Sequence, residues 1–248
     1  MEKKLPHLYL AAVLAAITLF SSCKKTKDSR PPDDEMPVYG TCQPVNATGR
    51  MQFTANSGDF TYTTSGGGHI KFNRKFGFVI SHDSWPGFQL DCWGTVNSSG
   101  IMTNSANHES LNGKHIKDRV GSVRTIVFPD GAKLTWVADG EQGELKTISI
   151  YDGSESHHIN ARCYTLESSI NNESITKRLD DAEADGETGS FEFIKTAAGE
   201  MDKVQYINIY QETTPGNRVN GRVLLAELFK NPPTQVNDYY DDPRLAAT

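Results

Sequence analysis

The fold of this chain is decided by residues 123–166, VRTIVFPDGAKLTWVADGEQGELKTISIYDGSESHHINARCYTL. A β-branched run over 123–128 ends at Pro129-Asp130-Gly131, where proline presets φ and glycine accepts a positive φ. Apolar residues then recur with a period of two, which is typical of a half-buried strand; they are Ala132, Leu134, Trp136 and Ala138. Strands at 145–151 and 157–166 follow after short turns, and short connections require antiparallel neighbours. The stretch therefore predicts a four-stranded β-meander with Trp136 in the core.

Strands are also predicted on both sides of the meander. Alternating patterns cover 51–55, 60–62, 70–72, 76–80 and 88–92 upstream, and 190–195, 204–210 and 218–229 downstream. Residues 97–114 lack a clear period and predict a long loop or irregular edge. One short helix is expected near 172–184, capped by Asn172 and ended by Gly186. We expect a mainly β fold, in which about ten strands form a sandwich or an open barrel.

The first 22 residues have the pattern of a secretory signal peptide. Lys3 and Lys4 precede LYLAAVLAAITLF at 8–20, a run of 13 apolar or neutral residues. Because a membrane-spanning helix needs about 20 apolar residues, this run fits the central region of a signal peptide instead. The run ends in Phe20-Ser21-Ser22-Cys23, which resembles the lipobox of bacterial lipoproteins. The resemblance implies cleavage before Cys23 and acylation of that residue; ordinary secretory cleavage near Ser22 is the alternative.

Residues 23–49 are expected to be the lipidated cysteine and a flexible tether, followed by a single all-β domain over 50–248. The stretch 24–35, KKTKDSRPPDDE, has no aliphatic or aromatic residue and cannot contribute to a core. Together with Cys23 it resembles lipoproteins of the Bacteroidota, many of which sit on the outer membrane. The resemblance implies a cell-envelope protein anchored to a membrane through Cys23. We expect the outer membrane, with the protein facing the periplasm or the cell surface.

Composition narrows the class of protein further. The net charge is −6, so the chain lacks the overall basic charge that is typical of nucleic-acid-binding proteins. A mean hydropathy of −0.51 with 23% charged residues is typical of a soluble domain. An envelope compartment permits one disulfide among Cys42, Cys92 and Cys163, and the sequence leaves the pairing open.

One acidic stretch is similar to an EF-hand calcium loop. The stretch DAEADGETGSFE, residues 181–192, has a glycine at loop position 6 and a glutamate at position 12. The similarity implies Ca²⁺ ligation by Asp181, Glu183, Asp185, Glu187 and Glu192. The alternative is an acidic helix end that turns into a strand.

Two further features are candidate ligand sites. On a strand over 157–166, His158 would share one face with Asn160, Arg162 and Tyr164, a polar row suited to an anionic or sugar ligand. A solvated strand face is the alternative interpretation. Trp85, beside Pro86-Gly87, is a candidate exposed platform for a sugar ring, and burial in the core is its alternative.

Catalytic residues cannot be assigned from the sequence. No Gly-x-Ser-x-Gly motif is present, and no pair of carboxylates is singled out. We therefore expect a non-catalytic binding module for a glycan or another envelope component. A lipid-anchored hydrolase of extracellular polymer and a structural or assembly lipoprotein that contacts other proteins are the alternatives.

The substitution Cys23→Ser tests the expected anchor. Without the thiol no lipid can be attached, so the variant should move from the membrane fraction to the soluble fraction when cells are fractionated. Continued membrane association of the variant would contradict the lipoprotein interpretation.

Overall fold

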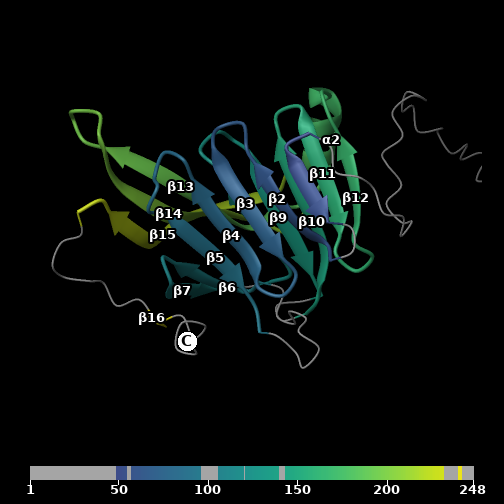
Figure 1. Ribbon diagram of the computed structural model, residues 1–248, viewed down its shortest axis with the longest axis horizontal. Helices are drawn as coiled ribbons and strands as arrows, with labels where there is room; N and C mark the ends of the chain where they lie inside the picture. Colours follow the sequence, from purple (N-terminus) through teal and green to yellow (C-terminus); the bar gives the residue numbers. More distant parts are fainter. Residues whose placement is uncertain are drawn as a thin grey trace, which may run out of the picture. The chain divides into compact units, whose positions relative to one another are not determined.

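The computed structural model describes residues 49–54, 57–95, 106–119, 121–139, 143–231 and the backbone of 240–241. These residues form two large, mostly antiparallel sheets and one short helix (Figure 1). The mainly β prediction is thereby confirmed. The expected signal peptide, Cys23 and nearly all of the tether lie outside the described residues.

Sheet 1 contains the N-terminal strands. From β1 to β7 each strand pairs antiparallel with the next strand in the chain, and the two-residue β16 pairs with β7. Across the sheet the order is β1 (Met51–Thr54), β2 (Asp59–Thr63), β3 (Gly68–Asn73), β4 (Gly77–His82), β5 (Gln89–Trp93), β6 (His108–Leu111), β7 (Lys114–Asp118) and β16 (Tyr240–Asp241).

Sheet 2 contains the predicted meander and the C-terminal strands. The antiparallel meander is confirmed, as β8 (Val123–Val127), β9 (Lys133–Ala138), β10 (Leu145–Asp152), β11 (Glu155–Asn160) and β12 (Thr165–Ser169). After helix α2 (Glu173–Ala182) the chain returns as β13 (Gly186–Lys195), which pairs parallel with β8. The long strands β14 (Met201–Glu212) and β15 (Arg218–Phe229) complete the sheet.

The two sheets pack face to face through one apolar core. Phe78 of sheet 1 lies 4.8 Å from Trp136 of sheet 2, and Phe88 lies 4.8 Å from Phe191, measured between ring centroids. Trp136 is fully buried, as the alternation in 132–138 predicts. Of the two predicted architectures, the described strands form the sandwich.

The Pro129-Asp130-Gly131 turn also links the sheets. The Asp130 carboxylate accepts hydrogen bonds from the Thr64 hydroxyl (2.7 Å) and the Gly66 amide (2.5 Å), both in the turn between β2 and β3. Burial alone would raise the pKa of Asp130, but these hydrogen bonds, with one from the Ala132 amide, lower it. A Cβ at Gly66 would lie 2.4 Å from the Asp130 Cβ, so only glycine permits this approach.

Two stretches differ from the prediction. The stretch 97–114, expected as a long loop or irregular edge, contains β6 and, in its described part, a tight turn at Asn112-Gly113, where both residues have positive φ. Asn-Gly at positive φ favours a type I′ hairpin, a signal that could have identified this strand pair. The predicted strand 157–166 is divided into β11 and β12, because the chain turns at 161–164.

Helix α2 confirms the predicted helix in a shorter form. The Asn172 side chain accepts a hydrogen bond from the Ile175 amide (3.1 Å), as the predicted N-cap requires. The helix ends at Ala182, and Glu183 already has extended backbone angles. The helix packs against β10 and β11.

A buried ion pair joins the sheets inside the sandwich. Glu109 of β6 and Arg124 of β8 have fully buried side chains, and the guanidinium binds the carboxylate through two nitrogens, at 2.7 and 3.0 Å. The Tyr206 hydroxyl donates to the same carboxylate (2.6 Å) and also contacts Arg124. Burial would lower the pKa of Arg124, but the charge of Glu109 and its hydrogen bonds outweigh burial and raise it.

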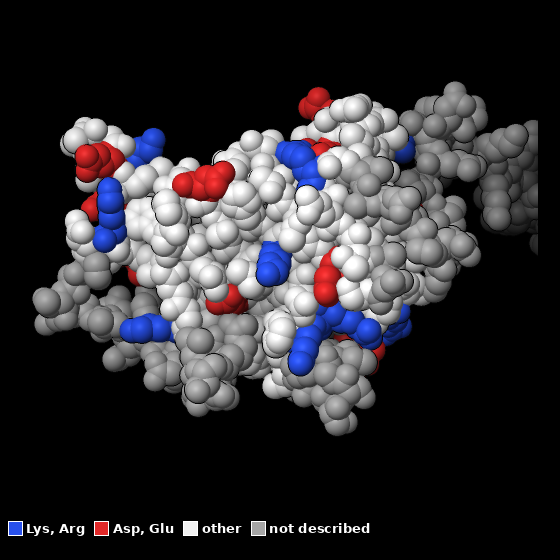
Figure 2. Space-filling view, in the orientation of Figure 1, with Lys and Arg blue, Asp and Glu red and all other residues white. Residues whose placement is uncertain are grey.

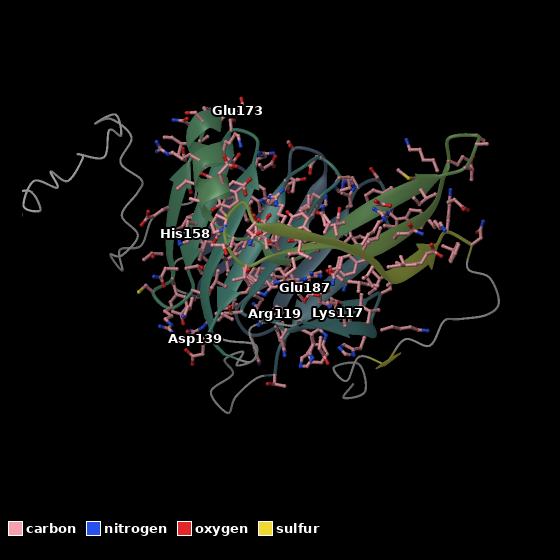
Figure 3. The ribbon with its side chains drawn as sticks, turned by 180° about the vertical axis from the view of Figure 1, so that it is seen from behind. Lys117, Arg119, Asp139, His158, Glu173 and Glu187 are labelled. Carbon is pink, nitrogen blue, oxygen red and sulfur yellow. The ribbon has the colours of Figure 1, made fainter. Side chains whose placement is uncertain are left out.

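Further polar residues connect this buried pair to Lys117, which is partly exposed. Arg124 also donates to the Glu187 carbonyl (3.0 Å) and the Asn208 side chain (2.9 Å). The Glu187 carboxylate in turn accepts from Asn208 (2.5 Å) and Lys117 (2.6 Å), and Figure 3 shows Lys117 and Glu187 close together. Strands β6, β7, β8, β13 and β14 are therefore held together by polar contacts as well as apolar ones.

The substitution Glu109→Gln should lower the free energy of unfolding by about 3–5 kcal/mol, because it leaves the charge of Arg124 buried without a counter-ion. Urea unfolding of the full chain measures the effect. The matched control is Asp181→Asn, which removes an exposed i,i+4 pair with Lys177 and should cost less than about 0.5 kcal/mol. Equal effects of the two substitutions would contradict a central role for the buried pair.

Candidate ligand-binding site

A pocket of about 320 Å³ opens at the end of the strands where β10 begins and β11 ends. This volume lies at the lower end of the range for small-molecule sites. Figure 3 places Asp139, which marks this end, far from Glu173 at the start of α2. Four segments of the chain line the pocket. Their lining residues are Ser57 and Gly58 from the first, Phe72 and Arg74 from the second, Glu144 and Leu145 from the third, and Ile159, Ala161, Arg162 and Tyr164 from the fourth.

The apolar part of the pocket belongs to the rigid core. Phe72 from sheet 1 and Leu145 and Ile159 from sheet 2 are all buried. Phe72 packs on Phe60 and Phe78, with ring centroids 5.3 and 4.8 Å apart. An apolar surface held in this way is preformed, which lowers the entropic cost of ligand binding.

Tyr164 forms one wall and is fixed by its own turn. The Asn160 side chain accepts hydrogen bonds from the amides of Arg162 (3.0 Å) and Cys163 (3.1 Å), which closes the turn after β11. Tyr164 has a φ of 54°, and its ring lies against Gly58, where a Cβ would approach within 2.6 Å. Cys163 is disulfide-bonded, so a covalent bond also restrains this turn.

Charged groups surround the pocket. The Arg74 guanidinium stacks over the Tyr164 ring, 4.3 Å from its centroid, while the Arg74 amide donates to Asp59 (2.9 Å). Arg162 is exposed and forms an ion pair with Asp139. Exposed Glu144 supplies a negative charge beside the two arginines. An arginine stacked on an aromatic ring keeps its in-plane N–H donors for a carboxylate or phosphate group.

The predicted polar row is only partly present. His158 lies on β11, where its Nδ1 contacts the Ser149 hydroxyl (3.1 Å), and burial lowers its pKa to about 4. Asn160 is engaged in the turn, and Arg162 and Tyr164 lie beyond the end of the strand. The four residues therefore do not share a strand face, but Arg162 and Tyr164 meet in the pocket.

The prediction of an exposed platform at Trp85 is wrong. Trp85 is 7% exposed and belongs to the core. The neighbouring Pro86 and Gly87 occupy the exposed positions of the turn, and the Phe88 amide donates to the Trp85 carbonyl (2.9 Å). A proline-glycine break therefore marks the turn correctly but does not make its tryptophan exposed.

The structure does not bring the predicted calcium ligands together. Asp181 pairs with Lys177 on the helix, Asp185 with Lys133 and Arg218, and Glu187 with Lys117. Glu192, far along β13, pairs with Arg222. These pairs use the carboxylate oxygens that Ca²⁺ would need.

Glu183 is held in a different environment. Its carboxylate accepts hydrogen bonds from Tyr151 (2.9 Å) and Ser149 (3.2 Å). Burial raises the pKa of Glu183 to about 7 despite those bonds, and a half-protonated carboxyl is a weak calcium ligand. In place of a calcium loop, Gly186 begins strand β13 directly.

Two cysteines can be placed. Cys163 is disulfide-bonded, and Cys92 is a buried thiol in the core. Cys23 and Cys42 themselves lie outside the described residues. Among the described residues, helix α2 is too short and too polar to cross a membrane.

The edge of sheet 2 holds a serine, a histidine and a glutamate in line. The sequence pattern does not connect these three residues. The Ser168 hydroxyl is 2.7 Å from Nδ1 of His157, and Nε2 of His157 is 2.7 Å from the Glu155 carboxylate. Burial lowers the pKa of His157 against the opposing effect of Glu155. Ser168 is exposed and opposes His157 across β11 and β12. The hydroxyl therefore has a neutral base beside it and a carboxylate that orients that base.

Comparisons with known proteins give no relative for this chain. No protein-family model, no curated protein and no solved structure matches it. Any functional assignment therefore depends on the geometry described above.

Proposed function

We propose that this chain is a lipid-anchored protein of the cell envelope that binds an acidic carbohydrate, without catalysis, in the pocket at the β10–β11 end. The Arg74 guanidinium stacked on Tyr164 above a buried apolar floor is the observation that carries the proposal. The anchor is inferred from residues 1–23 alone.

The chemistry of the pocket favours this class of ligand. A sugar ring presents an apolar face that fits against Phe72, Ile159 or the Tyr164 ring. Arg74 and Arg162 can donate forked hydrogen bonds to a carboxylate on the sugar, and Glu144 can accept from its hydroxyl groups. Arg162 is already paired with Asp139, so Arg74 is the positive charge that favours an acidic sugar over a neutral one.

Charge argues against a polyanionic polymer as ligand. The face shown in Figure 2 carries acidic as well as basic side chains, and several of the basic ones gather at its lower right. The net charge of −6 also opposes long-range attraction of polyanions. A short acidic saccharide held by local contacts is therefore favoured over a long nucleic-acid strand.

The substitution Arg74→Ala should weaken binding of an acidic saccharide by roughly 10- to 150-fold, since a hydrogen bond to a charged group contributes about 1.5–3 kcal/mol. Calorimetric titration of the full chain with tri-galacturonate, and with the matching neutral tri-galactose, measures this. Arg222→Ala is the matched control, because Arg222 is an exposed, ion-paired arginine on β15. Equal binding of the acidic and neutral sugars, or equal loss in both variants, would contradict the proposal.

A second candidate function, ester or glycan-ester hydrolysis, is favoured by the alignment of Ser168, His157 and Glu155. In this mechanism His157 accepts the Ser168 proton as the hydroxyl attacks the ester carbonyl, and Glu155 stabilises the imidazolium. The imidazolium then protonates the departing alcohol as the ester C–O bond breaks, and a water deprotonated by His157 releases the acid from Ser168. The Arg50 side chain binds the same glutamate (2.9 Å), which fixes the carboxylate.

Covalent labelling tests this second function. A fluorophosphonate probe should label the wild-type chain, and Ser168→Ala should abolish both labelling and hydrolysis of p-nitrophenyl acetate. Ser169→Ala is the matched control, since the neighbouring residue on β12 points to the opposite face of the strand. Absence of labelling in the wild-type chain would contradict this second function.

A further inference from the structure

Two histidines and an aspartate converge on sheet 1, away from the pocket and the serine. Nδ1 of His108 lies 2.6 Å, and Nε2 of His115 lies 2.8 Å, from the same carboxylate oxygen of Asp118. All three ligand atoms lie within 4.8 Å of one another. The two imidazole rings are 5.8 Å apart between centroids.

A β-bulge produces this convergence. His108 opposes Asp118 and Glu109 opposes Lys117, but Ser110 then opposes His115, so β7 holds one extra residue. In a regular strand, residues 115 and 118 would point to opposite faces. Because the extra residue shifts the alternation, both side chains reach one side of the sheet, and bulges commonly re-aim a side chain in this way next to functional sites.

The three side chains have the donor atoms of a transition-metal site. Imidazole nitrogens and a carboxylate oxygen suit Zn²⁺ and other first-row divalent ions. Tetrahedral Zn²⁺ with bonds of about 2.0–2.1 Å holds its ligand atoms about 3.3 Å apart. Asp118 would therefore move away from each histidine nitrogen by about half an ångström, and the two histidines would adjust to the same spacing. Asp118 can do so, because it ends β7 and its side chain is 60% exposed.

The surroundings fix one ligand and leave the site open to solvent. The Trp93 ring packs on His108, with centroids 4.6 Å apart, and its indole N–H donates to the Ser110 hydroxyl (2.9 Å). Trp93 is only 6% exposed, so the ring that orients His108 is itself held in place. The exposed side of Asp118 leaves room for water as a further ligand, as in zinc sites with three protein ligands.

An ordinary surface pair on the same sheet provides the contrast. His69 lies 2.7 Å from Asp83, but among the described residues this pair has no third ligand atom close enough to share one ion. Both partners are more exposed than His108 and His115. The His69–Asp83 pair therefore shows what a histidine-carboxylate contact without a metal site looks like, and it supplies a control.

We propose that His108, His115 and Asp118 bind one divalent first-row transition-metal ion, with Zn²⁺ as the expected occupant and water completing its coordination. The ion would join the start of β6 to β7, at the end of the hairpin away from the Asn112-Gly113 turn. This site is independent of the saccharide pocket, because the two share no residue.

Calorimetric titration of the metal-stripped full chain with Zn²⁺ tests the proposal. One ion should bind per chain, and at 100 times the Kd it should raise the Tm by roughly 5–10 °C. His115→Ala should weaken binding by at least about 100-fold, since loss of an outer partner alone costs 10- to 100-fold. Asp118→Asn, which nearly preserves shape, should also weaken binding, and His69→Ala should not.

Tryptophan fluorescence locates the ion. Cu²⁺ should quench the wild-type emission in part, and Trp93→Phe should remove this quenching while Zn²⁺ still binds. Melting of each variant without metal shows whether it is folded. The proposal is overturned if the wild-type chain binds no Zn²⁺, if folded His115→Ala keeps the wild-type affinity, or if His69→Ala loses as much as His115→Ala.

Discussion

The sandwich depends on one buried ion pair, Glu109 with Arg124. The Arg124 guanidinium donates hydrogen bonds to specific oxygens, on Glu109, Tyr206, Asn208 and the Glu187 backbone. An apolar core tolerates sliding of one sheet over the other, but a forked guanidinium-carboxylate contact does not. The Arg124 guanidinium also lies close to the backbone of residue 189. Only glycine fits there, because a Cβ would lie 2.8 Å from the guanidinium. The relative position of the sheets, and so the shape of the pocket between them, follows from this pair.

Local sequence patterns predict the turns, the strand alternation and the helix cap, because neighbouring residues determine these features. The Pro129-Asp130-Gly131 turn, the alternation around Trp136 and the Asn172 cap all correspond to observed features. Each is decided within a few residues, where turn chemistry and side-chain period act directly. The errors at 97–114 and 157–166 have a local cause too, because an Asn-Gly hairpin and the turn-forming Asn160 went unrecognised.

The candidate sites could be predicted much less well, because tertiary contacts create them. Arg124 lies within a run that reads as an ordinary strand, and its buried partner comes from a stretch without clear periodicity. The sequence singles out Arg162 as a candidate, but Arg74 and Phe72, which line the pocket with it, come from the other sheet. His115 and Asp118 share a face only because of a bulge in β7, which no periodic pattern reveals. For Trp85, the local sequence predicts an exposed side chain, but packing in the core buries it.

The parallel pairing of β13 with β8 has a consequence for the order in which sheet 2 acquires its contacts. Within the meander, each strand pairs with its chain neighbour, so little chain entropy is lost in closing each turn. Arg124 and Glu187, by contrast, meet across 63 positions of the chain. Pairing of Arg124 with Glu187 costs less conformational entropy once β9 to β12 and α2 have formed. These elements order the intervening segment and shorten the part of it that is still flexible. Formation of the meander therefore lowers the entropic cost of attaching the second half of the same sheet.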